Sequence, residues 1–258
     1  MAGKYARIFW TEVAHLREYK LEFFGEYLRI PIQIGLLYAL WSIVFAISGK
    51  TLIGGLEFEG FVFYIGMAAF VSSALPAWEV SEKISDFITR GKIIMILVRP
   101  VHFIPFFFAR EAADFVTRGL LAVAVFGLTG ALLGWFIPSH AWTIPLFVVS
   151  LVLGLSLQYL VTLCVGMMAF FMYTTWGVRG LMNTLKGFFS GELIPLTLFP
   201  AGLGFVASVL PFKYVLFVPL FVYLEQYSYG ESLRMLALQC LYIIVALFAS
   251  LFLSLIHI

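Results

Sequence analysis

Apolar runs, each about as long as a membrane-crossing helix, follow one another along most of the chain. A helix needs about 20 mostly apolar residues to cross a bilayer. The pattern predicts six spans, which we place at 30–48, 60–78, 119–137, 146–172, from 178 into the segment 188–200, and 235–256. We therefore expect an all-α integral membrane protein with a single transmembrane domain over residues 1–258.

The composition agrees with this class. Hydrophobic residues make up 62% of the 258 and charged residues only 12%, whereas soluble domains contain about 45–50% apolar and roughly 25% charged residues. The formal net charge of +2 is too small to indicate a nucleic-acid partner. Cys164 and Cys240 lie in apolar runs, where a free cysteine packs as a small hydrophobic residue.

The basic residues predict the orientation. If the N-terminus lies in the cytoplasm, all 16 lysine and arginine residues except Lys50, Lys213 and Arg234 fall on the cytoplasmic side. Lys186 belongs to that cytoplasmic set. Cytoplasmic loops carry an excess of Lys and Arg, so we expect both termini to be cytoplasmic.

Residues 3–28, before the first span, predict an amphipathic helix. Phe9, Val13 and Leu16 keep a spacing of three or four residues, while most acids of this stretch fall elsewhere. Such a helix lies in the membrane interface and orients the first span. A second interpretation is that it also touches a cytoplasmic partner.

The loop 79–100, between the second and third spans, predicts a short cytoplasmic helix with an apolar face. Ile84, Phe87 and Ile88 stand at i, i+3 and i+4 and share that face. Gly91 is placed to end the helix. Two interpretations stay open: the helix rests on lipid head groups, or it docks a soluble protein. The docking hypothesis assigns these residues to the contact: Glu82, Ile84, Asp86, Phe87, Ile88, Arg90 and Gly91.

A ladder of opposite charges is predicted where the chain enters the third span. Arg110, Asp114 and Arg118 are spaced by four residues, so they lie about one helical turn apart. Structural pairing along the helix is one interpretation of this ladder, and contact with a substrate is the other.

Small residues spaced by four positions predict close helix–helix contacts in lipid. Gly187 and Gly191 form such a pair in the fifth span, and Gly130 and Gly134 form another in the third. We expect the fifth-span pair to lie at an interface with a second membrane subunit.

The segment FFSGELIPLTLFP, residues 188–200, contains one acid, Glu192, close to Pro195. A carboxylate in hydrocarbon is costly and usually faces a protein interior or water, so we predict that Glu192 and Pro195 line a translocation path or gate. The alternative is that Glu192 reaches the outer interface. Apolar pieces that follow, cut at Pro200, Pro211 and Pro219, predict short re-entrant outer helices over 198–230.

Catalytic motifs are missing from the sequence. The histidines are scattered, and neither HExxH nor CxxC occurs. The stretch ISGKT ends like a phosphate-binding loop, but Val44 stands where that motif requires glycine. We therefore expect no enzyme activity, no metal and no cofactor in this chain.

Two stretches resemble bacterial ABC type-2 exporter permeases. ISDFITRGKIIMILVRPVHFIPFFFAREAADFV resembles the cytoplasmic loop of that family, in which an isoleucine, an acid, an Arg-Gly pair and an LLRP-like end recur. SGELIPLTLFPAGLGFVASVLPFKYVLFVPL resembles the segment at the end of the fifth span, with its spaced SG, Pro and LP. Glu192 departs from this pattern, which has a small or apolar residue there, and the cargo stays open.

The resemblance implies a permease of the bacterial inner membrane. Two six-span permeases, identical or paired with a sister chain, would bind two cytosolic ABC ATPases that hold the ATP and magnesium. The helix of 79–100 would be the coupling helix, seated in a groove of the ATPase. The alternative is a secondary transporter or channel, which would show internal repeats or several intramembrane charges.

Overall fold

The computed structural model describes residues 2–16, 20–73, 77–98, 102–133, 138–172 and 174–257, which are mostly helical. The elements in chain order are α1 (Ala2–Leu16), α2 (Lys20–Ser48), β1 (Leu52–Ile53), β2 (Leu56–Glu57), α3 (Phe58–Ser73), α4 (Ala77–Thr89), α5 (Ile94–Leu97), α6 (Phe103–Leu133), α7 (Thr143–Met167), the 3-10 turn η1 (Met168–Phe170), α8 (Trp176–Phe189), η2 (Leu196–Leu198), α9 (Ala201–Val209), η3 (Pro211–Tyr214), α10 (Phe217–Tyr223) and α11 (Tyr229–His257).

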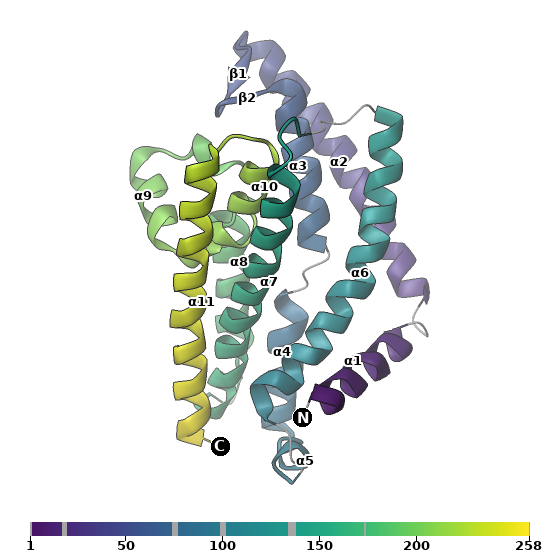
Figure 1. The fold of residues 1–258 in the computed structure, drawn as a ribbon, viewed down its shortest axis with the longest axis vertical. Coiled ribbons are helices and arrows are strands. Elements are labelled where there is room, and N and C mark those ends of the chain that lie inside the picture. The colour runs from purple at the N-terminus through teal and green to yellow at the C-terminus, as the bar shows by residue number, and fades with distance from the viewer. Residues whose placement is uncertain are drawn as a thin grey trace.

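The long helices run up and down along one axis of the molecule (Figure 1). The antiparallel hairpin of β1 and β2 marks one end, which we call the hairpin end. The short helix α5 marks the other, which we call the α5 end, and both chain termini lie toward it (Figure 1).

The larger apolar core surrounds α10, which packs on α3 and α7. Every side chain from residue 217 to 222 is buried. Lipid is as apolar as these side chains, so close packing rather than exclusion of water holds such helices together. Gly154 of α7 allows a close approach of the backbone before α10, because an added Cβ there would lie 2.7 Å from the carbonyl oxygen of Val215.

Two described helices are long and apolar enough to cross a membrane, Thr143–Phe170 and Tyr229–Ser254. A third crossing would come from Ala201–Val209 together with Pro211–Tyr223, a pair bent by 72°. The fifth predicted span is wrong as a continuous helix. Helix α8 has 14 residues, about 21 Å at 1.5 Å per residue, whereas the hydrocarbon core is about 30 Å thick.

The predicted helix over 3–28 is wrong in its C-terminal boundary. Helix α1 ends at Leu16, and α2 already begins at Lys20, so residues 20–28 prolong the helix of the first predicted span. Helix α1 instead lies against α6, where the guanidinium of Arg110 donates to both carboxylate oxygens of Glu12 at 3.0 and 2.8 Å.

The predicted breaks after residue 198 are confirmed at two prolines and wrong at the third. Pro200 and Pro211 each stand at the start of a helical turn. Pro219 lies inside α10, in its first turn, where a backbone N–H has no partner within the helix in any case. The chain therefore continues through Pro219 as a helix.

Candidate functional site

The predicted apolar docking face of α4 is occupied within the chain. Ile84 is fully buried, and a Cβ added at Gly166 of α7 would lie 2.8 Å from its Cβ. The Phe87 ring packs edge-on against the Phe107 ring of α6 at a centroid distance of 5.4 Å, and Ile88 packs against the same cluster. An apolar face looks the same in sequence whether it meets another protein or the chain's own helices. Ile84 is therefore not available for docking, and these contacts cover part of the surface of Phe87 and Ile88, which are partly buried.

The polar face of α4 is accessible. The side chains of Glu82, Asp86 and Arg90 are about half exposed or more, and an ion pair of 2.9 Å joins Asp86 to Arg90. Gly91 has a φ of +68° and ends the helix, as predicted. The backbone N–H of Ile93 returns to the carbonyl of Phe87 at 3.0 Å, which aims the chain into α5.

Helix α5 presents an apolar tip that the sequence analysis did not single out. Ile94, Met95 and Val98 are 62%, 51% and 80% exposed at the far end of the molecule (Figure 1). The run KIIMILV was visible inside the loop 79–100, but its apolar residues show no helical period that would separate an exposed face from a buried one.

In the described contacts, Arg110 and Asp114 of the predicted charge ladder on α6 pair with residues of other helices rather than with each other. Arg110 is bound to Glu12 of α1, and Asp114 accepts a hydrogen bond of 2.8 Å from the Lys83 ammonium of α4. An exposed i, i+4 ion pair stabilises a helix by only a few tenths of a kcal/mol. The bidentate contact of Arg110 with Glu12 and the buried contact of Asp114 with Lys83 are therefore favoured over pairing along α6. Arg118 lies one turn beyond Asp114 on the same helix. The ladder thus joins α1, α4 and α6.

The predicted gate residues stand where α8 ends. Gly191 has a φ of +82°, which glycine adopts without the strain that a side chain would add. A helix that continued would satisfy the Gly191 carbonyl through the N–H of residue 195, but Pro195 has none. The Tyr64 hydroxyl of α3 donates to that carbonyl instead at 2.7 Å. A side chain of α3 therefore satisfies the carbonyl that the break at Pro195 leaves without an intrahelical partner.

Glu192 has a charged partner inside the chain. Its carboxylate lies 3.7 Å from the Lys186 ammonium, and the two side chains are 26% and 11% exposed. Lys186, which sequence analysis assigned to the cytoplasmic side, thus sits on the last turns of α8 among buried residues. Counting basic residues in loops assigns every lysine to one side of the membrane and does not consider a lysine within a span. The pair of Lys186 and Glu192 was therefore not predicted.

Polar side chains from three helices gather beside Lys186. They line a small cavity of about 30 Å³, which has room for about one water molecule. The polar residues at this cavity are Ser81 of α4, Gln158 and Thr162 of α7, and Arg179, Asn183 and Lys186 of α8. Among the described residues, no group of histidine, cysteine or acidic side chains could hold a metal ion.

The two glycines of the predicted interface lie in different environments. A Cβ added at Gly187 would meet nothing within 4 Å, so this side of α8 is open. Gly191 is buried, and a Cβ there would clash with the Tyr64 hydroxyl and touch Phe217. Gly191 therefore belongs to the interior of the chain rather than to an interface. Of the other glycine pair, Gly134 lies outside the described residues.

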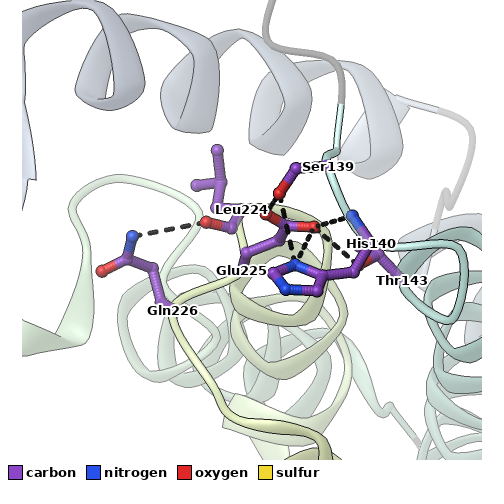
Figure 2. A network of polar contacts seen from close by, with 6 residues as sticks. All are labelled: Ser139, His140, Thr143, Leu224, Glu225 and Gln226. Atoms are coloured by element: carbon purple, nitrogen blue, oxygen red, sulfur yellow. Dashed lines mark hydrogen bonds and ion pairs between the residues drawn. The ribbon is translucent and has the colours of Figure 1, made fainter.

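A carboxylate at the hairpin end ties two loops together, which sequence analysis missed (Figure 2). Glu225 accepts hydrogen bonds from the Ser139 hydroxyl at 2.6 Å, the His140 N–H at 2.8 Å and the Thr143 hydroxyl at 2.9 Å. It also lies 3.0 Å from His140 Nδ1. The negative charge thus sits at the N-terminal, positive end of α7.

Glu225 takes the backbone position that glycine usually fills after a helix. Its φ is +55°, its N–H reaches the carbonyl of Val222, and the N–H of Gln226 reaches that of Phe221. Partial burial alone would raise the pKa of the Glu225 carboxyl, but the hydrogen bonds from Ser139, His140 and Thr143 prevail and lower it to about 2. These bonds offset the strain of a left-handed glutamate.

No curated protein and no solved structure matches the chain. A family of ABC-2 transporter proteins matches residues 32–255. Members of this family are membrane components that lack the ATPase domain, and ABC transporter permeases generally pair with ATPase subunits. The apolar helices and this match over most of the chain establish that the protein is a multi-pass membrane protein of the ABC-2 transporter family.

Proposed function

We propose that this chain is the transmembrane permease subunit of an ATP-driven exporter. It forms the translocation path with a second permease, identical or a sister chain, and cytosolic ABC ATPases that hold ATP and magnesium drive it. The family membership supports this proposal. The chain crosses the membrane six times in this proposal if α8 and the short helices that follow it together form the fifth crossing.

The α5 end faces the cytoplasm of a bacterium in this proposal, with both termini on that side. Arg90 and Lys92 lie just before α5, and Lys4 lies in α1 near the same end. Lys50 and Lys213 lie away from it, next to the hairpin and in η3. An excess of Lys and Arg marks the cytoplasmic side of membrane proteins.

The exposed apolar tip of α5 carries the docking proposal. Solvent-exposed apolar side chains at the end of a loop suit burial in a groove of a soluble partner. Helix α4 connects this tip to the membrane helices, because Ile84 is locked against Gly166 of α7. A movement of the ATPase at α5 would therefore carry α4 and α7 with it.

Copurification of the ATPase with the full-length permease tests this proposal. Met95→Asp places a charge on the tip without touching the core, and we expect it to lower ATPase copurification and transport-coupled ATP hydrolysis about tenfold or more, because an interfacial charge without a partner costs about 1.4 kcal/mol or more. Leu52→Asp, at an equally exposed apolar residue of the hairpin, is the control and should keep both. Undiminished copurification with Met95→Asp contradicts docking at α5.

Phe87→Asp is not a useful probe of docking. It would place a carboxylate against the Phe106 and Phe107 rings, and the resulting loss of stability would be mistaken for loss of the partner.

The ion pair of Lys186 and Glu192 favours a second candidate function, that of a secondary transporter. Paired charges at membrane depth are common in proton and ion pathways. Transport by proteoliposomes that contain the chain without any ATPase would support this candidate, and transport that requires the ATPase and ATP would exclude it.

A further inference from the structure

A groove between α6 and α7 has the shape and chemistry of a binding site. Its cavity measures about 270 Å³, near the lower end of the range for small-molecule sites. In Figure 1, α6 leans away from α7 toward the hairpin end. Its lining residues are Val80, Phe108, Glu111, Ala112, Asp114, Phe115, Val116, Val152, Leu155, Ser156, Gln158, Tyr159 and Thr162.

The groove has a polar floor and an apolar rim. Asp114 and Gln158 are buried, whereas Phe108, Val116 and Val152 are exposed along the opening. In a membrane protein, such exposed apolar side chains face the acyl chains of lipid. A molecule dissolved in the bilayer can therefore reach the groove from the side, and its polar end must be the part that goes in first.

The floor of the groove contains a carboxylate oxygen of Asp114 without a hydrogen-bond donor among the described residues. Asp114 is only 2% exposed. Its Oδ2 accepts from the Lys83 ammonium at 2.8 Å, while its Oδ1 has no hydrogen-bond partner among the described residues. Leaving a buried charged acceptor without a donor costs about 1–3 kcal/mol or more. Glu111, which lies 4.0 Å from the same ammonium, adds a second negative charge to the lining.

We propose that this groove binds an amphiphile whose primary ammonium group meets Asp114 and whose apolar chain lies along Phe108, Val116 and Val152. This inference rests on the proposed function, and it names the chemical class of molecule that a membrane permease would take up here. A cation fits better than a neutral donor, because charge-assisted hydrogen bonds are about twice as strong. An anion is disfavoured by the two carboxylates, and water could solvate the polar floor but would leave the apolar rim without a partner.

The test measures binding of radiolabelled dodecylamine to the full-length chain in phosphatidylcholine nanodiscs, without any ATPase. Dodecanol, which has the same apolar chain and no charge, is the matched competitor. We expect saturable binding of the amine and at least about tenfold weaker competition by the alcohol. Asp114→Asn should weaken amine binding by a similar factor while leaving the affinity for dodecanol unchanged.

Two tryptophan variants keep the test decisive if Asp114→Asn fails to fold. Val152→Trp fills the rim of the groove, whereas Val149→Trp adds the same bulk on an exposed position of α7 outside it. Only Val152→Trp should abolish amine binding. Equal binding by both variants, or equal competition by dodecanol and dodecylamine, overturns the proposal.

Replacing part of the phosphatidylcholine with phosphatidylethanolamine distinguishes the two sources of a primary ammonium. Competition by this lipid identifies a membrane lipid as the occupant, and the lack of competition identifies a dissolved lipophilic amine. Because no ATPase takes part, failure of these measurements leaves the docking proposal at α5 standing, and failure of docking leaves this site standing.

Discussion

Tyr64 of α3 closes the break that follows α8, because its hydroxyl donates to the carbonyl of Gly191 at 2.7 Å across 127 residues of sequence. Both groups are buried. The bond replaces the intrahelical partner that Pro195 cannot supply. It therefore holds the end of the short helix α8 against α3.

Tyr64→Phe should destabilise the protein by about 1–3 kcal/mol, because the buried Gly191 carbonyl would lose its donor. For a chain of this size, that corresponds to an apparent unfolding temperature lower by about 2–4 °C per kcal/mol. Thermal unfolding in detergent measures the change. Tyr38→Phe removes the hydroxyl of an exposed tyrosine and should leave the temperature unchanged. An equal effect of both variants would show that the Tyr64 bond carries no particular stability.

The two glycines at the end of α8 should respond differently to alanine. Gly191→Ala forces a side chain into a φ of +82° and places its Cβ 2.4 Å from the Tyr64 hydroxyl. We expect a loss of several kcal/mol, since backbone strain and overpacking each cost about 1–3 kcal/mol. Gly187→Ala has open space within α8 and should unfold at or slightly above the wild-type temperature, because alanine is favoured over glycine in a helix. Urea or thermal unfolding of the two variants compares them.

The Gly187→Ala variant also tests the predicted interface between permeases. If the open face around Gly187 packs on a second subunit, Gly187→Ala weakens subunit association while the monomer stays stable. Cross-linking or native mass spectrometry reports the subunit ratio. Association that matches the wild type after both Gly187→Ala and the bulkier Gly187→Leu would remove α8 from the interface.

The class of fold and the helical segments follow from the length and apolarity of the runs. The end of α4 at Gly91 was also readable, because only glycine takes a positive φ there without strain. The partner of an apolar helix face could not be predicted from the sequence, because the spacing of Ile84, Phe87 and Ile88 is the same whether this face packs on the chain's own helices or on an ATPase. Contacts that join distant residues, such as Lys83 with Asp114, leave no trace in local periodicity.

The ends of the spans were the least predictable part of the candidate site. Hydropathy continues across Ser190 and Gly191 into the next apolar piece, so the fifth span looked continuous although α8 ends at Phe189. Glu225 was invisible for a different reason. A glutamate in the left-handed position of a helix end is unusual, and only the donors of the loop 139–143 make it favourable.

Glu225 should stabilise the hairpin end above about pH 4.5 and lose this effect in acid. Its folded pKa is lowered to about 2 from the ordinary 4.5. A depressed carboxyl pKa contributes stability that is fully present above the unfolded value and is lost as the pH falls toward the folded value. The difference in unfolding temperature between wild type and Glu225→Gln should be present at pH 5 and shrink as the pH falls below about 4.5.

Three further variants check the cause of that pH dependence. Glu57→Gln removes an exposed acid of the hairpin and should show no such pH-dependent difference. Glu225→Ala keeps the strained φ and loses the hydrogen bonds, whereas Glu225→Gly loses the bonds but relieves the strain, so the alanine variant should be less stable by about 1 kcal/mol. A constant difference down to pH 2 for Glu225→Gln, or a glycine variant less stable than the alanine one, contradicts the role assigned to Glu225.

Variants of Lys186 and Glu192 distinguish a structural role of this ion pair from a role in transport. Glu192→Gln leaves the buried Lys186 ammonium without its acid, which we expect to destabilise the protein by on the order of 1–3 kcal/mol. That is below the 3–5 kcal/mol of a fully buried pair because Glu192 is partly exposed. Lys186→Met should cost less, since the Glu192 carboxylate can still be hydrated. The double variant should recover stability beyond the sum of the single changes, as a double-mutant cycle measures.

Export by the double variant then decides the role of Glu192. If the acid only neutralises Lys186, the stable double variant exports at the wild-type rate, because nothing in the core is left charged. If Glu192 also acts on cargo or keeps the path hydrated, the double variant assembles and hydrolyses ATP normally but exports poorly. A stable Glu192→Gln single variant with full export would contradict both roles, since neither a buried lysine without its acid nor a gate without its charge would then matter.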